Sequence, residues 1–93
     1  MLMTPKNTTP SDAAKAICYC VQVGFVSIIP HAYEAMADDG VDELELERIL
    51  ATGDVAANRS HPDRWSVQAP CSVEVVVELE SDPWTTVITV LYR

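Results

Sequence analysis

The spacing of apolar residues changes at Gly53, and this change constrains the fold of the chain more than any other feature. Before Gly53 the apolar residues recur at helical spacing. After Gly53 they alternate with polar residues, as in strands with one buried face. No connection after Gly53 is long enough for a crossover helix, so the strands are expected to be antiparallel. We therefore predict an α+β fold with about three N-terminal helices packed on a C-terminal antiparallel sheet of about three to four strands.

The helices are predicted from their start and stop residues. They are expected within residues 11–24, 30–40 and 42–53, each ending at a glycine. Ser11 is the expected cap of the first helix, Pro30 suits the first turn of the second, and Asp42 is expected to open the third. The buried stripe of the third helix is expected to be Leu44, Leu46, Ile49 and Leu50. Residues 1–10 contain two prolines and three threonines and are predicted to form a flexible tail. Residues 11–93 are predicted to form a single domain.

A simple meander predicts how the strands pair. Trp65 then faces Val77, and Val75 lies between Val67 and Thr89. Residues that share the face of Trp65 are expected to lie beneath the helices. This predicted core face consists of Trp65, Val67, Val73, Val75, Val77, Leu79, Val87 and Leu91.

The opposite face of this meander carries further apolar residues that the helices need not cover. A large exposed apolar patch on a small domain indicates a protein partner or a homodimer. A slip of one residue in the register would exchange the two faces, because side chains alternate along a strand. The predicted interface residues are Val76, Ile88, Val90 and Tyr92.

The charge of the chain disfavours nucleic acid as a partner. With 14 acidic residues against 6 lysines and arginines, the net charge of −8 repels RNA phosphates at long range. Seven of the acids lie between Glu34 and Glu47, but not at the spacing of a calcium-binding EF-hand. We expect them near helix N-termini, where the helix dipole favours negative charge.

Nothing in the sequence predicts a cofactor, a metal or a membrane. Cys18, Cys20 and Cys71 lack metal-site spacing, and we expect small buried residues in a reducing compartment. No apolar run approaches the ~20 residues of a membrane helix, and the N-terminus has no signal-peptide pattern. We therefore predict a cytoplasmic protein without cofactor or metal.

Several motifs occur in the order of a known family. They are Gly-x-Val at 24–26, His-Ala-x-x-x-Met-x-x-x-Gly-Val at 31–41, Gly-Asp-Val at 53–55, Arg-Trp-x-Val at 64–67, and the final VEVVVEL and VITVLYR strands. Together they resemble the small bacterial domain of unknown function 4258 over residues 11–93. The resemblance implies an α+β domain distantly similar to RelE-like and barnase-like ribonucleases, the toxins of toxin–antitoxin systems.

One position departs from the family pattern. The helix of the family usually carries a basic residue just before its glycine, where this chain has Asp39 after Asp38. The exchange removes a cation that an RNA-cleaving site would use to stabilise a charged phosphorane.

Five residues are candidates for ribonuclease chemistry. His31 could act as general acid or base, with Arg64 stabilising charge. Arg59, His61 and Arg93 could bind a substrate phosphate. In a meander, however, Arg64 and Arg93 lie at opposite ends of the sheet and do not converge on one phosphate.

Each candidate also has a purely structural interpretation. His31 would begin a helix and bond a backbone group. The loop from Asn58 to Arg64 would be a solvated connection, with Arg64 paired to Glu78 across the sheet. The Tyr92-Arg93 terminus would be an ordinary strand end.

Two functional hypotheses follow. The favoured one is a protein-interaction or regulatory module, which binds through the predicted interface residues or the acidic helices. The alternative is a toxin-like, metal-independent ribonuclease of the mRNA interferase type. Whether the chain is an enzyme stays open at this point.

Overall fold

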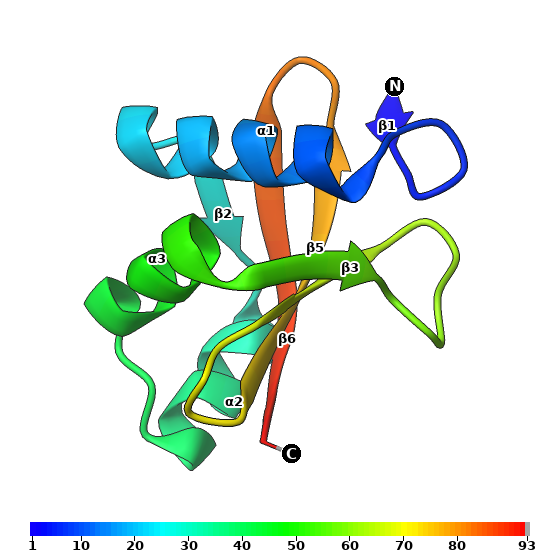
Figure 1. The fold of residues 1–93 in the computed structure, drawn as a ribbon. Coiled ribbons are helices and arrows are strands. Elements are labelled where there is room, and N and C mark those ends of the chain that lie inside the picture. Colours follow the sequence, from blue (N-terminus) through cyan, green and yellow to red (C-terminus); the bar gives the residue numbers. More distant parts are fainter. Residues whose placement is uncertain (93) are drawn as a thin grey trace.

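The computed structural model describes residues 1–92, so Arg93 lies outside the described residues (Figure 1). Over these residues the chain forms three helices and one six-stranded sheet, which confirms the α+β class. Along the chain the elements are β1 (Leu2–Met3), α1 (Pro10–Val23), β2 (Val26–Ile28), α2 (Pro30–Asp39), α3 (Glu43–Thr52), β3 (Asp54–Ala57), β4 (Trp65–Gln68), β5 (Val73–Glu80) and β6 (Trp84–Tyr92).

The helices begin and end close to the predicted residues. Asp42 caps α3 by accepting a 2.8 Å hydrogen bond from the Glu45 N–H. Gly40 ends α2 in the left-handed conformation that glycine adopts without strain. The cap predicted for α1 is wrong by two residues: the Thr9 side chain accepts from the Asp12 N–H, and Pro10 opens the helix.

The sheet is larger than predicted and mixed rather than antiparallel. Its strand order is β2-β6-β5-β4-β3, and β1 also pairs with β5. The strands after Gly53 pair antiparallel, as expected from their short connections. However, β2 pairs parallel with β6. The long connection that a parallel pair requires is supplied by all the elements between these two strands.

A β-bulge in β6 makes part of the observed register differ from the predicted one. The β4–β5 pairs Trp65–Val77 and Val67–Val75 are confirmed. From Val76 back to Val73 the pairing with β6 is shifted by one residue, so Val75 faces Val90 instead of Thr89. A bulge leaves one residue unpaired and thereby exchanges the faces of all residues that follow it.

The bulge also overturns two predicted burial assignments. Val90, assigned to the exposed interface, is buried in the core, whereas Leu91, assigned to the core, is exposed. Of the other predicted interface residues, Val76 is buried, Ile88 is half-buried and Tyr92 is exposed. The four side chains therefore do not form one exposed apolar patch.

The core lies between the helices and one face of the sheet. In Figure 1, α1 and α3 lie over the sheet on the viewer's side, and β3 runs across β5 and β6 because the sheet is strongly twisted. Trp65 is the largest fully buried side chain. In the core cluster the helices contribute Ala13, Ile17, Cys20, Ala32, Met36, Leu46, Ile49 and Leu50.

The N-terminal segment is part of the fold, which differs from the flexible tail predicted over residues 1–10. Leu2 and Met3 extend the sheet beside the end of β5. The Met3 carbonyl accepts a 2.9 Å hydrogen bond from the indole nitrogen of Trp65. This bond satisfies the one polar atom of a buried indole. The segment therefore closes one end of the core.

No helix within residues 1–92 combines the length and the apolar character needed to cross a membrane.

Candidate functional site

The sheet has one polar face, which we call the outer face because it points away from the core. Register pairs place residues of neighbouring strands side by side on this face. The outer face comprises Asp54 and Ala56 of β3, Ser66 and Gln68 of β4, Glu74, Val76 and Glu78 of β5, and Thr86, Thr89 and Leu91 of β6.

A pocket of about 280 Å³ opens on the outer face near β3. It is lined by Asp54, Ala56, Ala57, Arg59, Ser66, Gln68 and Glu74. Of the predicted candidates within residues 1–92, only Arg59 lines this pocket. No histidine that could act as a general acid or base is among the residues that line this pocket.

Glu74 forms part of the pocket wall and was not among the predicted site residues. Glu74 is only 2% exposed, although its side chain is on the polar outer face of the sheet. Its carboxylate accepts a 2.7 Å hydrogen bond from the Ser66 hydroxyl, which in turn accepts one from the Asn58 amide at 2.9 Å. A buried carboxylate requires such donors to offset its lost hydration. An acidic residue between Val73 and Val75 in a β-branched run was the available signal.

The Gln68 side chain, another polar group of the pocket, also bonds within the protein. The Gln68 amide nitrogen lies 3.2 Å from the Ala69 carbonyl and 3.3 Å from the Val73 carbonyl, and donates to both. Together with the bonds of Ser66, these contacts hold the β4–β5 connection in place. The arrangement is that of a structural hydrogen-bond network more than of a catalytic site.

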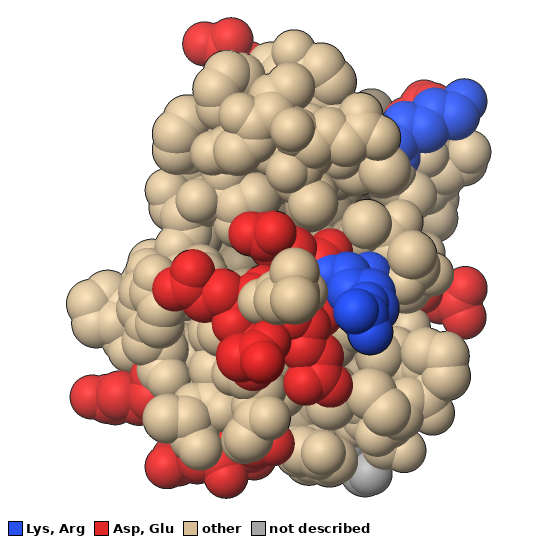
Figure 2. Space-filling model, turned by 90° about the vertical axis from the view of Figure 1, so that its left-hand side faces the viewer, with Lys and Arg blue, Asp and Glu red and all other residues tan. Residues whose placement is uncertain are grey.

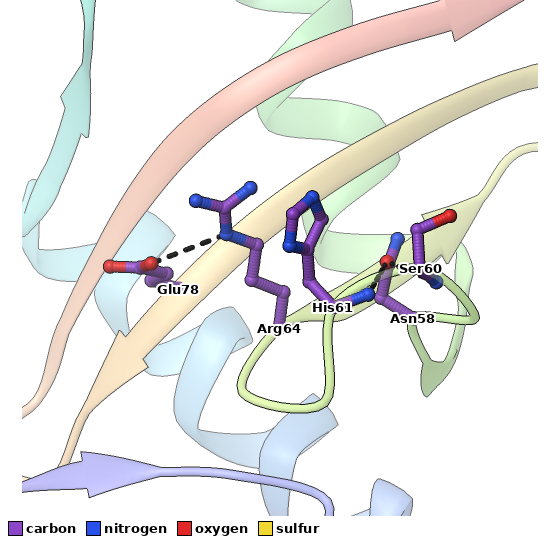
Figure 3. Close-up of polar contacts among 5 residues, drawn as sticks. All are labelled: Asn58, Ser60, His61, Arg64 and Glu78. Carbon is purple, nitrogen blue, oxygen red and sulfur yellow. Dashed lines mark hydrogen bonds and ion pairs between the residues drawn. The ribbon is translucent and has the colours of Figure 1, made fainter.

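The predicted basic loop is organised by Asn58, as Figure 3 shows. The Asn58 side-chain oxygen accepts from the backbone N–H groups of Ser60 and His61, at 3.0 and 2.9 Å. This pattern is an Asx turn, in which a side chain replaces a backbone acceptor. It brings the His61 ring beside the Arg64 side chain (Figure 3).

Arg64 is paired across the sheet, as the structural interpretation predicted. Its Nε donates to Glu78 Oε2 at 3.3 Å, and both side chains are partly buried (Figure 3). A carboxylate at this distance cancels much of the field that a bound phosphate would require. The pairing therefore weakens the case for Arg64 as a charge-stabilising catalytic group.

His31 lies apart from the pocket. Its ring is exposed at the N-terminus of α2, and its Nε2 lies 3.5 Å from the Thr89 hydroxyl on β6. The expected bond to a backbone group is thus replaced by a side-chain contact. Arg93, the last predicted phosphate-binding residue, lies outside the described residues.

Acidic side chains gather on another surface, formed by α2 and α3. Residues 30–52 contain seven acidic residues and one arginine, a net charge of −6. Figure 2 shows acidic side chains clustered at the centre of the face to which α3 belongs. Leu44, predicted to be buried, lies between Glu43 and Glu45 in the sequence and is 69% exposed. We call Leu44 and its acidic neighbours Asp42, Glu43, Glu45 and Glu47 the acidic face.

Metal ligands do not gather in the described part of the chain. Over residues 1–92, His, Cys, Asp and Glu side chains form no group of three or more that could hold a metal ion. The cysteines are free thiols. Cys20 is buried as predicted and Cys18 is half-buried, but Cys71 is exposed, which corrects the prediction for that residue.

Comparison with known proteins identifies one family. The family described as domain of unknown function (DUF4258) matches residues 28–92, from the end of β2 to the end of β6. No curated protein and no solved structure matches the chain. The similarity to RelE-like and barnase-like toxins stays a prediction.

Proposed function

We propose, from the premise that the chain belongs to the family of the domain of unknown function (DUF4258), that it is a protein-interaction module whose acidic face binds a basic segment of a partner protein. The supporting observation is Leu44, which is 69% exposed on α3, next to Glu43 and Glu45 in the sequence and one helical turn before Glu47 and Arg48. An exposed leucine on a charged surface is suited to anchor a partner protein, while the charges select and orient that partner.

The electrostatics of the acidic face support a cationic partner. Its four carboxylates belong to the segment 30–52, which has a net charge of −6 out of −8 for the whole chain. Such a surface attracts lysine- and arginine-rich segments at long range and repels RNA. The proposed partner is therefore a basic amphipathic segment with an apolar side chain that packs on Leu44. Binding of this kind in the bacterial cytoplasm suits a regulatory role.

The ribonuclease alternative has weaker support. It requires an acid or base and a cation that converge on one phosphate. His31 contacts Thr89 outside the pocket, and Arg64 is paired with Glu78. Arg59 lines a pocket that also contains the carboxylates of Asp54 and Glu74. These carboxylates oppose binding of a polyanion.

A titration with a synthetic amphipathic peptide of lysine and leucine tests the proposal. Isothermal calorimetry at low and high salt should detect binding that weakens as salt screens the charges. The double variant Glu43→Gln/Glu47→Gln should weaken binding by about tenfold, because both carboxylates flank Leu44. Leu44→Ala should weaken it as well, whereas Leu91→Ala, which removes an exposed leucine elsewhere, should not.

A matched control separates the acidic face from net charge. The double variant Asp63→Asn/Asp82→Asn also removes two negative charges, but from exposed loops outside α3. Equal loss of binding in both double variants would show that only net charge matters and would contradict the proposal. RNA cleavage by the wild-type protein that is lost in His31→Ala would overturn it in favour of the alternative.

A further inference from the structure

An exposed group of large apolar side chains lies where α1, β2 and the β5–β6 turn meet. Phe25 stacks on Trp84, with ring centroids 5.3 Å apart, and Tyr19 approaches Phe25 edge-on at 6.5 Å. Val23 lies one helical turn from Tyr19 on α1 and is also exposed. We call these four residues the aromatic patch. Each leaves roughly two fifths or more of its surface in water.

The side of the aromatic patch formed by α1 and β2 is uncharged: residues 16–33 contain no aspartate, glutamate, lysine or arginine, although 22% of the chain is charged. The β5–β6 turn on the other side carries Asp82 and Glu80, and the Glu80 carboxylate lies 3.6 Å from the N-terminal amine. In Figure 2, the upper part of the face, where α1 ends, consists mainly of uncharged side chains above the acidic cluster. The patch therefore differs in chemistry from the acidic face proposed for a basic partner.

The strand β2, beside the patch, forms one edge of the sheet. The Phe25 carbonyl accepts from the Thr85 N–H, and the Ile29 N–H donates to the Val87 carbonyl. Successive residues of a strand direct their backbone groups to opposite sides. The N–H and C=O groups of Val26 and Ile28 therefore point away from β6. Among the described strands, none other than β6 pairs with β2.

An open edge with unpaired backbone groups is a template for another strand. We propose that the occupant is a second copy of the chain, paired through β2 in an antiparallel, two-fold symmetric arrangement. Ser27 then lies on the axis, and Val26 of each copy faces Ile28 of the other. These two pairs exchange the outward backbone hydrogen bonds, because directly opposed residues of an antiparallel ladder bond in both directions. The aromatic patches flank this joint.

The charges favour a second copy as the occupant of this edge. Two chains of net charge −8 repel each other at long range, so association costs least where the surfaces that meet carry little charge. The α1 side of the aromatic patch and β2 meet this condition, whereas the β5–β6 turn adds the carboxylates of Glu80 and Asp82. The opposite edge of the sheet does not, because β3 begins with the exposed carboxylate of Asp54. A domain of this size also gains stability from association. This inference is independent of the proposed function, which uses a different surface.

Two tyrosines provide a matched test. Tyr19 lies in the patch and Tyr33 lies on α2, and both are helical residues that are 47% exposed. Sedimentation velocity over a concentration series should show a dimer for wild type and for Tyr33→Lys. Tyr19→Lys should weaken the dimer by at least about tenfold, because association would bury an unpaired ammonium. Both variants lower the net negative charge equally, so a loss confined to Tyr19→Lys cannot come from general repulsion.

Amide hydrogen exchange of the wild-type protein gives an independent readout that needs no variant. The N–H groups of Val26 and Ile28 should exchange slowly at concentrations where the dimer forms and rapidly on dilution. The Ile29 N–H, which bonds β6 within one chain, should not change. Any of three results would overturn the proposal: a monomer at all concentrations, a dimer that persists in Tyr19→Lys, or amide exchange rates at Val26 and Ile28 that do not depend on protein concentration.

Discussion

The Ser66 hydroxyl lies 2.7 Å from Oε2 of Glu74 and donates a hydrogen bond to this buried carboxylate. In Ser66→Ala the carboxylate loses a charge-assisted bond while it stays buried, so we expect a loss of about 1–3 kcal/mol in the free energy of unfolding. Urea denaturation of the variant measures this loss. Ser60→Ala, at an exposed position in the neighbouring loop, should change stability by less than about 0.5 kcal/mol. Equal effects would mean that the Ser66 bond contributes nothing specific.

Thr85 provides the opposite case, a hydroxyl whose removal should stabilise the protein. The side chain is fully buried, and its oxygen has no hydrogen-bond partner among the described residues. Thr85→Val keeps the shape and removes the unsatisfied group, so we expect a gain of about 1 kcal/mol in thermal or urea unfolding. Thr85→Ala also removes the hydroxyl but leaves a cavity, and should therefore lose stability. A loss in Thr85→Val would indicate that the hydroxyl has a partner.

Glycine is required at position 53 because a larger side chain would clash, and not because of the backbone angles there. Its φ is −73°, but an added Cβ would lie 2.7 Å from Val67 Cγ1 and 2.8 Å from the Ile49 carbonyl oxygen. Gly53→Ala should therefore cost about 2–3 kcal/mol, since the backbone of α3 must shift. Gly40→Ala meets no atom within 4 Å and should cost about 1 kcal/mol, from left-handed strain alone. A reversed order of the two melting temperatures would contradict this assignment.

Tyr33 should ionise at a higher pH than an ordinary tyrosine. The hydrogen bond that its hydroxyl donates to Glu43 at 3.0 Å raises its pKa, and partial desolvation and the Glu43 charge act in the same direction. Because the folded-state pKa is raised, the stabilisation is fully present below the ordinary tyrosine pKa and is lost as pH rises through the raised value. Glu43→Gln should lower this pKa in a titration followed by tyrosinate absorbance. Glu47→Gln, which lacks contact with the Tyr33 hydroxyl, should leave it unchanged.

Local signals in the sequence predicted much of the fold. The glycine at position 40, the aspartate cap at position 42 and the alternation around Trp65 each depend on neighbours in the chain or on one short connection. The cross-strand pair of Arg64 and Glu78 followed from the same alternation. These features were predicted correctly because each is determined within a few residues or by a single turn.

Features that depend on distant contacts were not predicted. The pairing of β2 with β6 joins segments about 60 residues apart, and nothing within the short run around Val26 specifies that partner. The bulge in β6, opposite Val76 and Val77, changes the face of Val90 without a local marker such as glycine. Leu44, which is exposed, was assigned to the core because its apolar character and helical spacing fit a buried position. Only the packing of α3 against the rest of the protein determines which face of the helix is exposed. The acidic helices, by contrast, were visible as a run of charge.

The two tryptophans occupy contrasting surroundings, and this gives the protein two built-in optical reporters. Trp65 is enclosed in the core and bonded to Met3, whereas Trp84 is partly in water and stacked on Phe25. Their intrinsic fluorescence should therefore differ in emission wavelength and in access to a soluble quencher. In a single-tryptophan variant that retains Trp84, a change in emission would follow events at the aromatic patch without any unfolding, while Trp65 would respond only when the core opens.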